Sequence, residues 1–380
     1  MPPLDLSHIP VVDNHCHGVY AHQGPFTPDQ WRCYFTESRE PKTRTEHVAT
    51  TLFYRRLVHT LAEFLGCPPT EAAVLAARQA RAPHDLIRDL LRAANIAALL
   101  VDQGYPPPDQ VMPDARVGQL VGCRTLPMLR LEVLFQRLIG EHASMAAVIE
   151  ALRTELADVR AQGYVALKTI VAYRTGLDIR TWPDAAVAAA FRTARQAVAE
   201  HGAVRLAHQP LLDTLLHVAF AAAAQQELPV QFHTGYGDTD ADLRLANPLH
   251  LRAVLEQPAY HGMPVVVLHE AYPYTREGAY LAAVYDRVYL DLSYATPFLS
   301  YTEMLAFTRA ALGVAPTSKL LYSSDAVGLP ELHWISAIQG RRILGTVLDE
   351  AVAHGELSTN EAEAAGEAML RGNAMRLYGL

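Results

Sequence analysis

The sequence predicts an α/β fold, a (β/α)8 barrel of the TIM-barrel class, and three observations favour it. Eight short runs rich in Val, Leu and Ile recur along the 380 residues, and most are continuously apolar rather than alternating. Such strands are typically covered on both faces, as in a parallel sheet with helices outside. Longer segments with helical periodicity lie between the runs, and eight strand–helix units favour a closed barrel over an open doubly wound sheet.

The expected strands, in chain order, are residues 10–15 (PVVDNH), 95–102 (NIAALLVD), 125–132 (TLPMLRLE), 164–172 (YVALKTIVA), 229–234 (PVQFHT), 264–269 (PVVVLH), 288–293 (VYLDLS) and 319–325 (KLLYSSD). Three of the intervening segments are clear helix candidates. Residues 183–202 are Ala-rich and end at a Gly, the residue at which helices commonly stop. Residues 211–226 and 246–258 also have helical patterns.

The segment between the first two expected strands is too long for a simple crossover. It spans residues 27–92 and includes a helical pattern over residues 46–66. We expect a helical insertion here that caps one end of the barrel. No Ser/Gly-rich linker or repeat separates independent domains, so residues 1–380 are expected to form a single barrel domain with this cap.

Composition narrows the class of protein. The chain is 50% hydrophobic and 19% charged, as expected for a globular protein with a large core. Its net charge of −8 argues against a nucleic-acid partner. The four scattered cysteines indicate reduced thiols, and neither a secretory signal nor a membrane-spanning stretch is evident. We therefore expect a soluble, cytoplasmic protein that acts on a small molecule; its oligomeric state is open, a homo-oligomer included.

Polar residues end several of the expected strands. His15 and His17 follow the first strand two residues apart, a spacing that directs both imidazoles to one side. Lys168, His233, His269 and Asp325 lie at or near the ends of the fourth, fifth, sixth and eighth strands. Active sites of such barrels lie at the C-terminal ends of the strands. Each residue also has a structural interpretation, such as Asp325 as a helix N-cap, but the six together favour a metal site.

This arrangement resembles the amidohydrolase superfamily of metal-dependent hydrolases. GNAMRLYGL (372–380) resembles the closing motif of the branch that includes aminocarboxymuconate-semialdehyde decarboxylase. LKTIVAYRTGL (167–177) and HEAYPYTREGAYLA (269–282) resemble the amidohydrolase-like half of fungal FluG-type proteins. In those proteins this half is fused to a glutamine-synthetase-like half, which we do not expect in this chain. The resemblance implies one or two divalent ions, Zn²⁺ first among them, held by His15, His17, Lys168, His233, His269 and Asp325.

Lys168 has two open roles. Burial favours a neutral amine, which can react with carbon dioxide to give a carbamate. Two-metal members of the superfamily use such a carbamylated lysine to bridge the ions, whereas the decarboxylase branch uses one metal. Alternatively, Lys168 stays an unmodified cation that binds a substrate carboxylate.

Further candidates lie in the loops after strands four and six. Tyr173, Arg174, Tyr274 and Arg276 are the predicted substrate-binding residues, because arginine suits bidentate recognition of carboxylates. Asp13 is expected to support the two histidines, and Arg130 and Glu132 to pair with each other. His22, His208 and Asp238 are expected to be structural or to support the residues of the site. No P-loop or Rossmann glycine pattern is present.

The predicted reaction is metal-assisted hydrolysis of an amide, ester or lactam bond in a small carboxylate-bearing substrate. A bound divalent ion lowers the pKa of water from 15.7 to about 7 and so supplies hydroxide at neutral pH. Asp325 and His269 are the predicted catalytic residues, with Asp325 carrying the proton to the leaving group. The alternatives are a non-oxidative decarboxylase of the aminocarboxymuconate-semialdehyde type and, from another class, a metal-binding regulatory protein without catalysis.

Overall fold

The structure is a computed structural model that describes residues 4–380. Eight strands form one sheet, in which the strands are neighbours in chain order from β1 to β8. The strands are β1 (Val11–His17), β2 (Ile96–Asp102), β3 (Arg124–Arg130), β4 (Ala166–Thr169), β5 (Val230–Phe232), β6 (Val265–Val267), β7 (Val288–Ser293) and β8 (Leu320–Ser323). The pairs β1/β2, β3/β4, β4/β5, β5/β6 and β6/β7 are parallel. The Asp325 N–H donates to the His15 carbonyl at 2.9 Å, which brings the chain after β8 beside β1. The fold is a (β/α)8 barrel, as the sequence predicts.

The chain divides into two compact units. The first comprises the described part of Met1–Leu126, together with Gly237–Thr239 and Asp291–Leu380. The second comprises Pro127–Tyr236 and Asp240–Leu290. No helix within residues 4–380 combines the length and apolar character needed to cross a membrane. All four cysteines are free.

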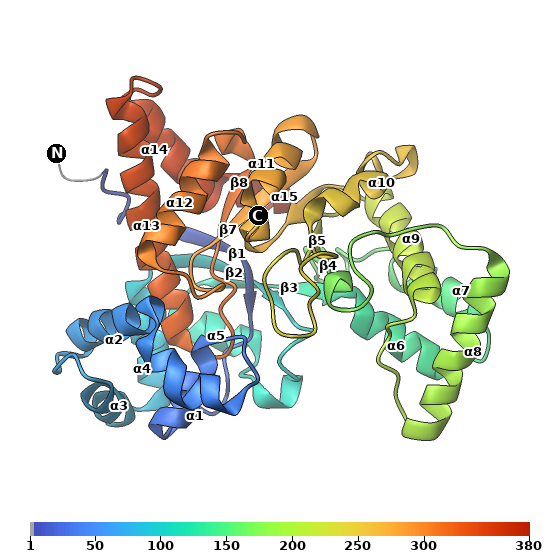
Figure 1. Ribbon diagram of the computed structural model, residues 1–380, viewed down its shortest axis with the longest axis horizontal. Helices are drawn as coiled ribbons and strands as arrows, with labels where there is room; N and C mark the ends of the chain where they lie inside the picture. The colour runs from blue at the N-terminus through green and yellow to red at the C-terminus, as the bar shows by residue number, and fades with distance from the viewer. Residues whose placement is uncertain (1–3) are drawn as a thin grey trace. The chain divides into compact units, whose positions relative to one another are not determined.

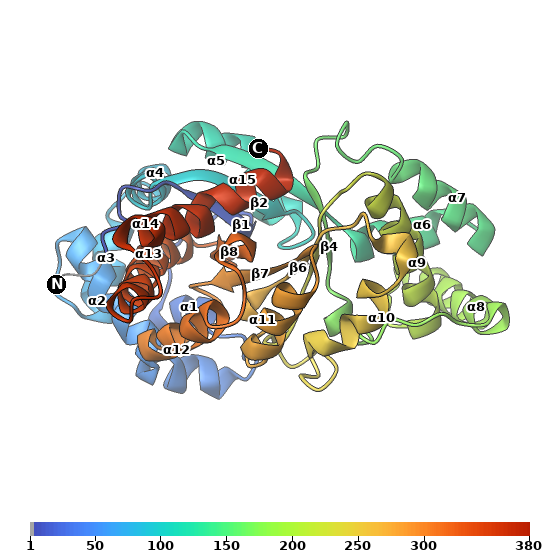
Figure 2. The ribbon, with the colours of Figure 1, turned by 90° about the horizontal axis from the view of Figure 1, so that it is seen from above.

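The first unit holds helices from both ends of the chain. They are α1 (Pro28–Arg32), α2 (Leu52–Leu65), α3 (Glu71–Gln79), α4 (Pro83–Ala93), α5 (Asp114–Val121), α12 (Tyr301–Leu312), α13 (Pro330–Ala353), α14 (Thr359–Glu367) and α15 (Asn373–Tyr378). Helix α13 is the longest of them and is buried along much of its length. It packs beside α4, α12 and α14. Figures 1 and 2 show α13 next to α14.

Helices do occupy the long segment between β1 and β2, but the helix expected over residues 46–66 starts late. Helix α2 begins at Leu52, because Thr51 has an extended backbone and its hydroxyl accepts a hydrogen bond from the Tyr54 N–H at 3.2 Å. It ends at Gly66, whose φ of 68° suits glycine. The placement of this segment over one end of the barrel stays a prediction.

Arg78 of α3 fastens this segment to α13. Arg78 as a whole residue is 2% exposed, and its Nε donates to Glu331 Oε1 in α13 at 2.6 Å. Its guanidinium carbon also lies 5.0 Å from the ring centre of Phe26 and 4.8 Å from that of Trp31. The buried guanidinium thus pairs with a carboxylate, contacts two aromatic faces and also donates to Gln23.

The second unit holds α6 (Leu131–Glu141), α7 (Met145–Glu155), α8 (Asp184–His201), α9 (Gln209–Gln225), α10 (Arg252–Leu255) and α11 (Thr275–Val284). Helices α8 and α9 match the segments expected at residues 183–202 and 211–226. The prediction of one helix over residues 246–258 is wrong in its length. The segment forms a 3₁₀ turn at Pro248–Leu251 followed by the short α10, and Pro258 disfavours helical backbone before it.

Candidate metal site

Three buried side chains of the first unit converge where β1 and β8 end. His15 Nε2 lies 3.3 Å from Asp325 Oδ1, and His17 Nε2 lies 3.4 Å from the same oxygen. The exposed fractions of His15, His17 and Asp325 are 0%, 8% and 8%. Ligand atoms held at about 2.1 Å by a tetrahedral zinc ion lie roughly 3.4 Å from one another. The distances from Asp325 Oδ1 to the two imidazole nitrogens therefore match the separation of zinc ligands.

A backbone carbonyl fixes the orientation of one of these imidazoles. His17 Nδ1 lies 2.9 Å from the Tyr105 carbonyl oxygen. Because a carbonyl oxygen only accepts hydrogen bonds, Nδ1 must carry the proton. The lone pair is then on Nε2, the nitrogen that faces Asp325. Metal-binding histidines commonly have this kind of support.

Asp325 is held in an uncommon backbone conformation. Its φ is 47°, in the left-handed region that non-glycine residues seldom adopt. The Asp13 carboxylate fixes the preceding residue by accepting from the Ser324 N–H at 2.8 Å and from its hydroxyl at 2.5 Å. The same hydroxyl accepts from the Ala326 N–H at 3.0 Å. Such strain persists where the surroundings hold the backbone from several sides. Asp13 thus positions the turn that carries Asp325, instead of the histidines for which its support was expected.

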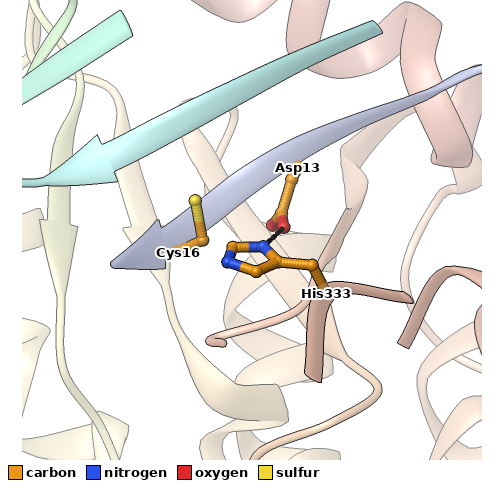
Figure 3. Close-up of side chains that lie close together, drawn as sticks. All are labelled: Asp13, Cys16 and His333. Atoms are coloured by element: carbon orange, nitrogen blue, oxygen red, sulfur yellow. Dashed lines mark ion pairs between the residues drawn. The ribbon is translucent and has the colours of Figure 1, made fainter. Parts of the chain in front are cut away.

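A second buried group lies behind this turn, formed by Asp13 and Cys16 of β1 and His333 of α13 (Figure 3). His333 Nδ1 is 3.5 Å from Asp13 Oδ2. Cys16 Sγ donates to the Leu100 carbonyl at 3.4 Å, and burial, followed by the Asp13 charge, raises the pKa of the thiol well above its usual range. Because metal ions bind the thiolate, this group suits a supporting role for Asp13 better than a metal site of its own.

Asp102, the last residue of β2, is a site candidate that the sequence analysis missed. A carboxylate oxygen of Asp102 and ring nitrogens of His15 and His17 all lie within 4.8 Å of one another. The Gly104 N–H donates to Asp102 Oδ1 at 2.9 Å and orients the carboxylate. An acidic residue ending a predicted strand was the available signal.

Glu37, in the loop after α1, was also missed. Burial is the largest cause that raises the pKa of Glu37, to about 7, and the negative charges of Asp325 and Asp238 contribute in the same direction. His17 and Arg39 lower it. The Glu37 carboxyl, whose pKa is near 7 and depends on the Asp325 charge, therefore lies in the surroundings of the candidate metal site. No local sequence pattern marks it.

The Glu37 pKa predicts a pH dependence of stability. In the folded, metal-free protein Glu37 keeps its proton up to about pH 7, whereas in the unfolded chain it loses it near 4.5. The folded state binds more protons between these values, so Glu37 lowers the free energy of unfolding as the pH rises through this window. We expect the melting temperature of chelator-treated wild type to fall more between pH 5 and pH 7 than that of Glu37→Gln. Glu363→Gln, at an exposed position, should behave like wild type; equal slopes in all three would contradict the assignment.

In the second unit, two of the predicted histidines lie together after β5 and β6. The ring centres of His233 and His269 are 4.6 Å apart, and both side chains are buried. The Tyr173 ring lies 4.2 Å from that of His233. His269 begins three consecutive residues with left-handed backbone, at φ values of 60°, 52° and 53°. Backbone strain of this kind clusters at functional sites.

Lys168 is 1% exposed on β4, in register with Arg130 of β3 and Gln231 of β5. Strand β4 ends at Thr169, before the expected residue 172, because the buried Glu132 binds the chain that follows Lys168. Its Oε1 accepts from the Thr169 hydroxyl at 2.6 Å and the Ile170 N–H at 3.0 Å. Burial raises the pKa of Glu132, and Arg130 lowers it as a smaller effect.

The other predicted substrate-binding residues differ in their surroundings. Tyr173 and Arg174 follow β4, and the Tyr173 ring lies beside that of His233. The Tyr274 hydroxyl donates to the Leu243 carbonyl at 3.0 Å. Arg276 is exposed in the first turn of α11 and forms no hydrogen bond or ion pair with any residue of 4–380. Tyr173 and Arg174 are therefore the better supported pair.

His22, Asp238 and His208, the other polar candidates of the sequence, differ in their surroundings. His22 is exposed and its ring is 6.2 Å from that of Phe26. Asp238 pairs with Arg39 at 2.5 Å. His208 precedes α9, and its Nδ1 is buried without a hydrogen-bond partner among residues 4–380.

The amidohydrolase family model matches residues 113–380. The chain belongs to the amidohydrolase family. This amidohydrolase is 28% identical over 403 residues to protein fluG of Emericella nidulans, and the alignment covers 98% of the chain and 46% of fluG. The chain thus spans about half the length of the curated relative that it matches.

Solved structures similar to this chain include a protein described as a metal-dependent hydrolase. A provisionally assigned metal-dependent hydrolase from Lactobacillus casei ATCC 334 is 28% identical, with a TM-score of 0.86 and coverage of 99% of this amidohydrolase and 98% of that chain. A uronate isomerase from Thermotoga maritima is 15% identical, with a TM-score of 0.67 and coverage of 98% and 95%. The second likeness shows the shared barrel fold alone.

Proposed function

We propose that this amidohydrolase is a metal-dependent enzyme that hydrolyses an amide, ester or lactam bond of a small carboxylate-bearing substrate. The observation that carries the proposal is the approach of His15 Nε2 and His17 Nε2 to one oxygen of Asp325, at 3.3 and 3.4 Å. Two buried imidazoles, one of them oriented by a backbone carbonyl, and a buried carboxylate are ligand types of a zinc site, and both nitrogen–oxygen distances suit such a site.

In this proposal His15, His17 and Asp325 hold a divalent ion, with zinc as the first choice. When bound, the ion polarises the substrate carbonyl and makes water more acidic. Asp325 takes the proton of the attacking water on its carboxylate and passes it to the leaving nitrogen or oxygen. Lys168, His233 and His269 are proposed as further ligands, with His269 also catalytic, and carbamylation of the buried Lys168 would accompany a second ion.

Loss of a ligand should be visible as loss of metal. We expect His17→Ala to weaken zinc binding by at least tenfold, because even residues that only support metal ligands contribute about 10–100-fold. Zinc content after chelation, reloading and dialysis would be measured for wild type, His17→Ala and a control, His59→Ala, at an exposed position of α2. Unchanged zinc content in His17→Ala would remove this residue as a ligand.

The reaction class is tested with the zinc-loaded protein and a panel of amides, esters and lactams that carry a carboxylate. The proposal predicts release of amine, ammonia or alcohol, and loss of that release when zinc is removed. Carbon dioxide without these products would indicate the decarboxylase instead. Stoichiometric zinc without turnover of any member of the panel would favour the non-catalytic regulatory protein.

A further inference from the structure

Two arginines of the second unit share one hydrogen-bond acceptor. Arg174 Nη1 lies 3.4 Å from the Tyr173 carbonyl oxygen, and Arg205 Nη2 lies 3.3 Å from the same oxygen. Arg174 comes directly after Tyr173 in the segment that follows β4, whereas Arg205 comes from the connection between α8 and α9. The fold thus brings two guanidinium groups together from separate segments.

This pairing of like charges is only partly compensated. Arg174 is half-buried, and burial lowers its pKa, with Arg205 and Arg130 lowering it further. Glu132 and Asp240 act in the opposite sense. Asp240 also pairs with Arg205 Nη2 at 3.2 Å. Glu132 is a weak counter-charge, because burial favours its neutral form. At the half-buried Arg174 guanidinium the repulsion by other cations costs more than in water, whereas the side chains of Arg205 and Asp240 are more exposed, at 53% and 37%.

Arg174 also has donors to spare. Its only hydrogen bond within the described chain comes from Nη1, and its Nε is buried without a partner. Nε and Nη2 form the side edge of the guanidinium, with two parallel N–H groups. That edge matches the two oxygens of a planar carboxylate. Nε and Nη2 of Arg174 thus have no acceptor within the described chain, and a second cation lies nearby. An anion would supply that acceptor and offset the positive charge.

The Tyr173 side chain contacts a predicted metal ligand of the same unit, His233. Its ring centre is 4.2 Å from that of His233. Because Arg174 directly follows Tyr173 in the chain, its backbone adjoins the residue whose ring contacts His233.

We propose that Arg174 and Arg205 form a carboxylate-binding subsite, in which the Nε–Nη2 edge of Arg174 grips the carboxylate and Arg205 adds a second positive charge. The inference rests on the proposed function, since it assigns the subsite to the substrate of the same site. The substrate class is then a small dicarboxylic compound, with one carboxylate at the arginines and the bond to be cleaved on the side of His233.

Glutarate, acetate and phosphate serve as probes, with binding to the zinc-loaded protein measured by isothermal titration calorimetry at pH 7. We expect glutarate to bind more tightly than acetate or phosphate. Arg174→Gln should weaken glutarate binding about tenfold or more, in line with the loss of a hydrogen bond between charged groups. Arg174→Lys should restore part of it, because the charge returns without the two-donor edge. Arg205→Gln should weaken it less.

Arg244→Gln is the matched control, since Arg244 is an exposed residue of the same unit that pairs with Asp242 at 2.6 Å. No glutarate binding by wild type, tighter binding of phosphate, or equal affinities of wild type and Arg174→Gln would overturn the subsite. Repeating the titration after zinc removal separates the two proposals. Arg174-dependent binding without turnover of the panel refutes only hydrolysis, whereas turnover with a KM insensitive to Arg174→Gln refutes only the subsite.

Discussion

Asp325→Asn is expected to lower kcat by about 10²–10⁴-fold, the contribution of a well-placed general acid–base group. The carboxylate oxygen that lies 3.3 and 3.4 Å from the two imidazoles would become part of a neutral amide, which cannot take up a proton at neutral pH. The barrel should stay folded, because the contacts that shape this turn involve other groups. They are the Asp325 backbone N–H and the hydrogen bonds between Asp13 and Ser324.

Rates would be measured at saturating zinc, so that weaker metal binding is separated from loss of the proton carrier. Asp109→Asn, at an exposed position before α5, is the matched control and should keep wild-type activity. Circular dichroism and the melting temperature report the fold. A variant with near-normal kcat at saturating zinc would refute the acid–base role of Asp325.

Arg78→Met is expected to lower the free energy of unfolding by about 3–5 kcal/mol, because it leaves Glu331 buried without its charge partner. The pair is almost fully buried, with exposed side-chain fractions of 1% and 0%. Arg78 also donates to the Gln23 side chain at 2.8 Å and contacts the rings of Phe26 and Trp31. The loss should therefore exceed that of any surface ion pair, for which about 0–1 kcal/mol is typical.

Urea unfolding measured by fluorescence would give the free energies. The double variant Arg78→Met/Glu331→Gln should recover part of the loss, because the uncompensated carboxylate is gone. Arg55→Met, at an exposed position of α2, should stay within about 0.5 kcal/mol of wild type. A loss of less than 1 kcal/mol for Arg78→Met would show that this contact does not fasten the insertion.

Periodicity and residue type predicted the barrel well, because each strand carries its own apolar run. Residues 288–293 coincide with β7, and the other strands differ from expectation by a few residues at their ends. The main differences arise from long-range contacts. β4 is short because Glu132, from another part of the chain, captures the Thr169 hydroxyl and the Ile170 N–H. Only the folded chain brings such groups together.

The same reason explains what was and was not predicted about the site. His15, His17 and Asp325 each end a predicted strand, and the structure brings them together. The hydrogen bonds between Asp13 and Ser324 join residues 311 positions apart, and no local pattern indicates them. The pKa of Glu37 likewise depends on charges far along the chain. Arg205 lies outside every motif that the sequence offered.

The most direct measurement is a crystal structure of the zinc-loaded protein, with anomalous scattering recorded on both sides of the zinc absorption edge. The account predicts an ion bonded to His15 Nε2, His17 Nε2 and an Asp325 oxygen, at about 2.0–2.2 Å. Any further bonds of the ion, and density beyond the Lys168 amine, would decide between one and two metals. A zinc-loaded crystal with no anomalous peak among His15, His17 and Asp325 would contradict the account.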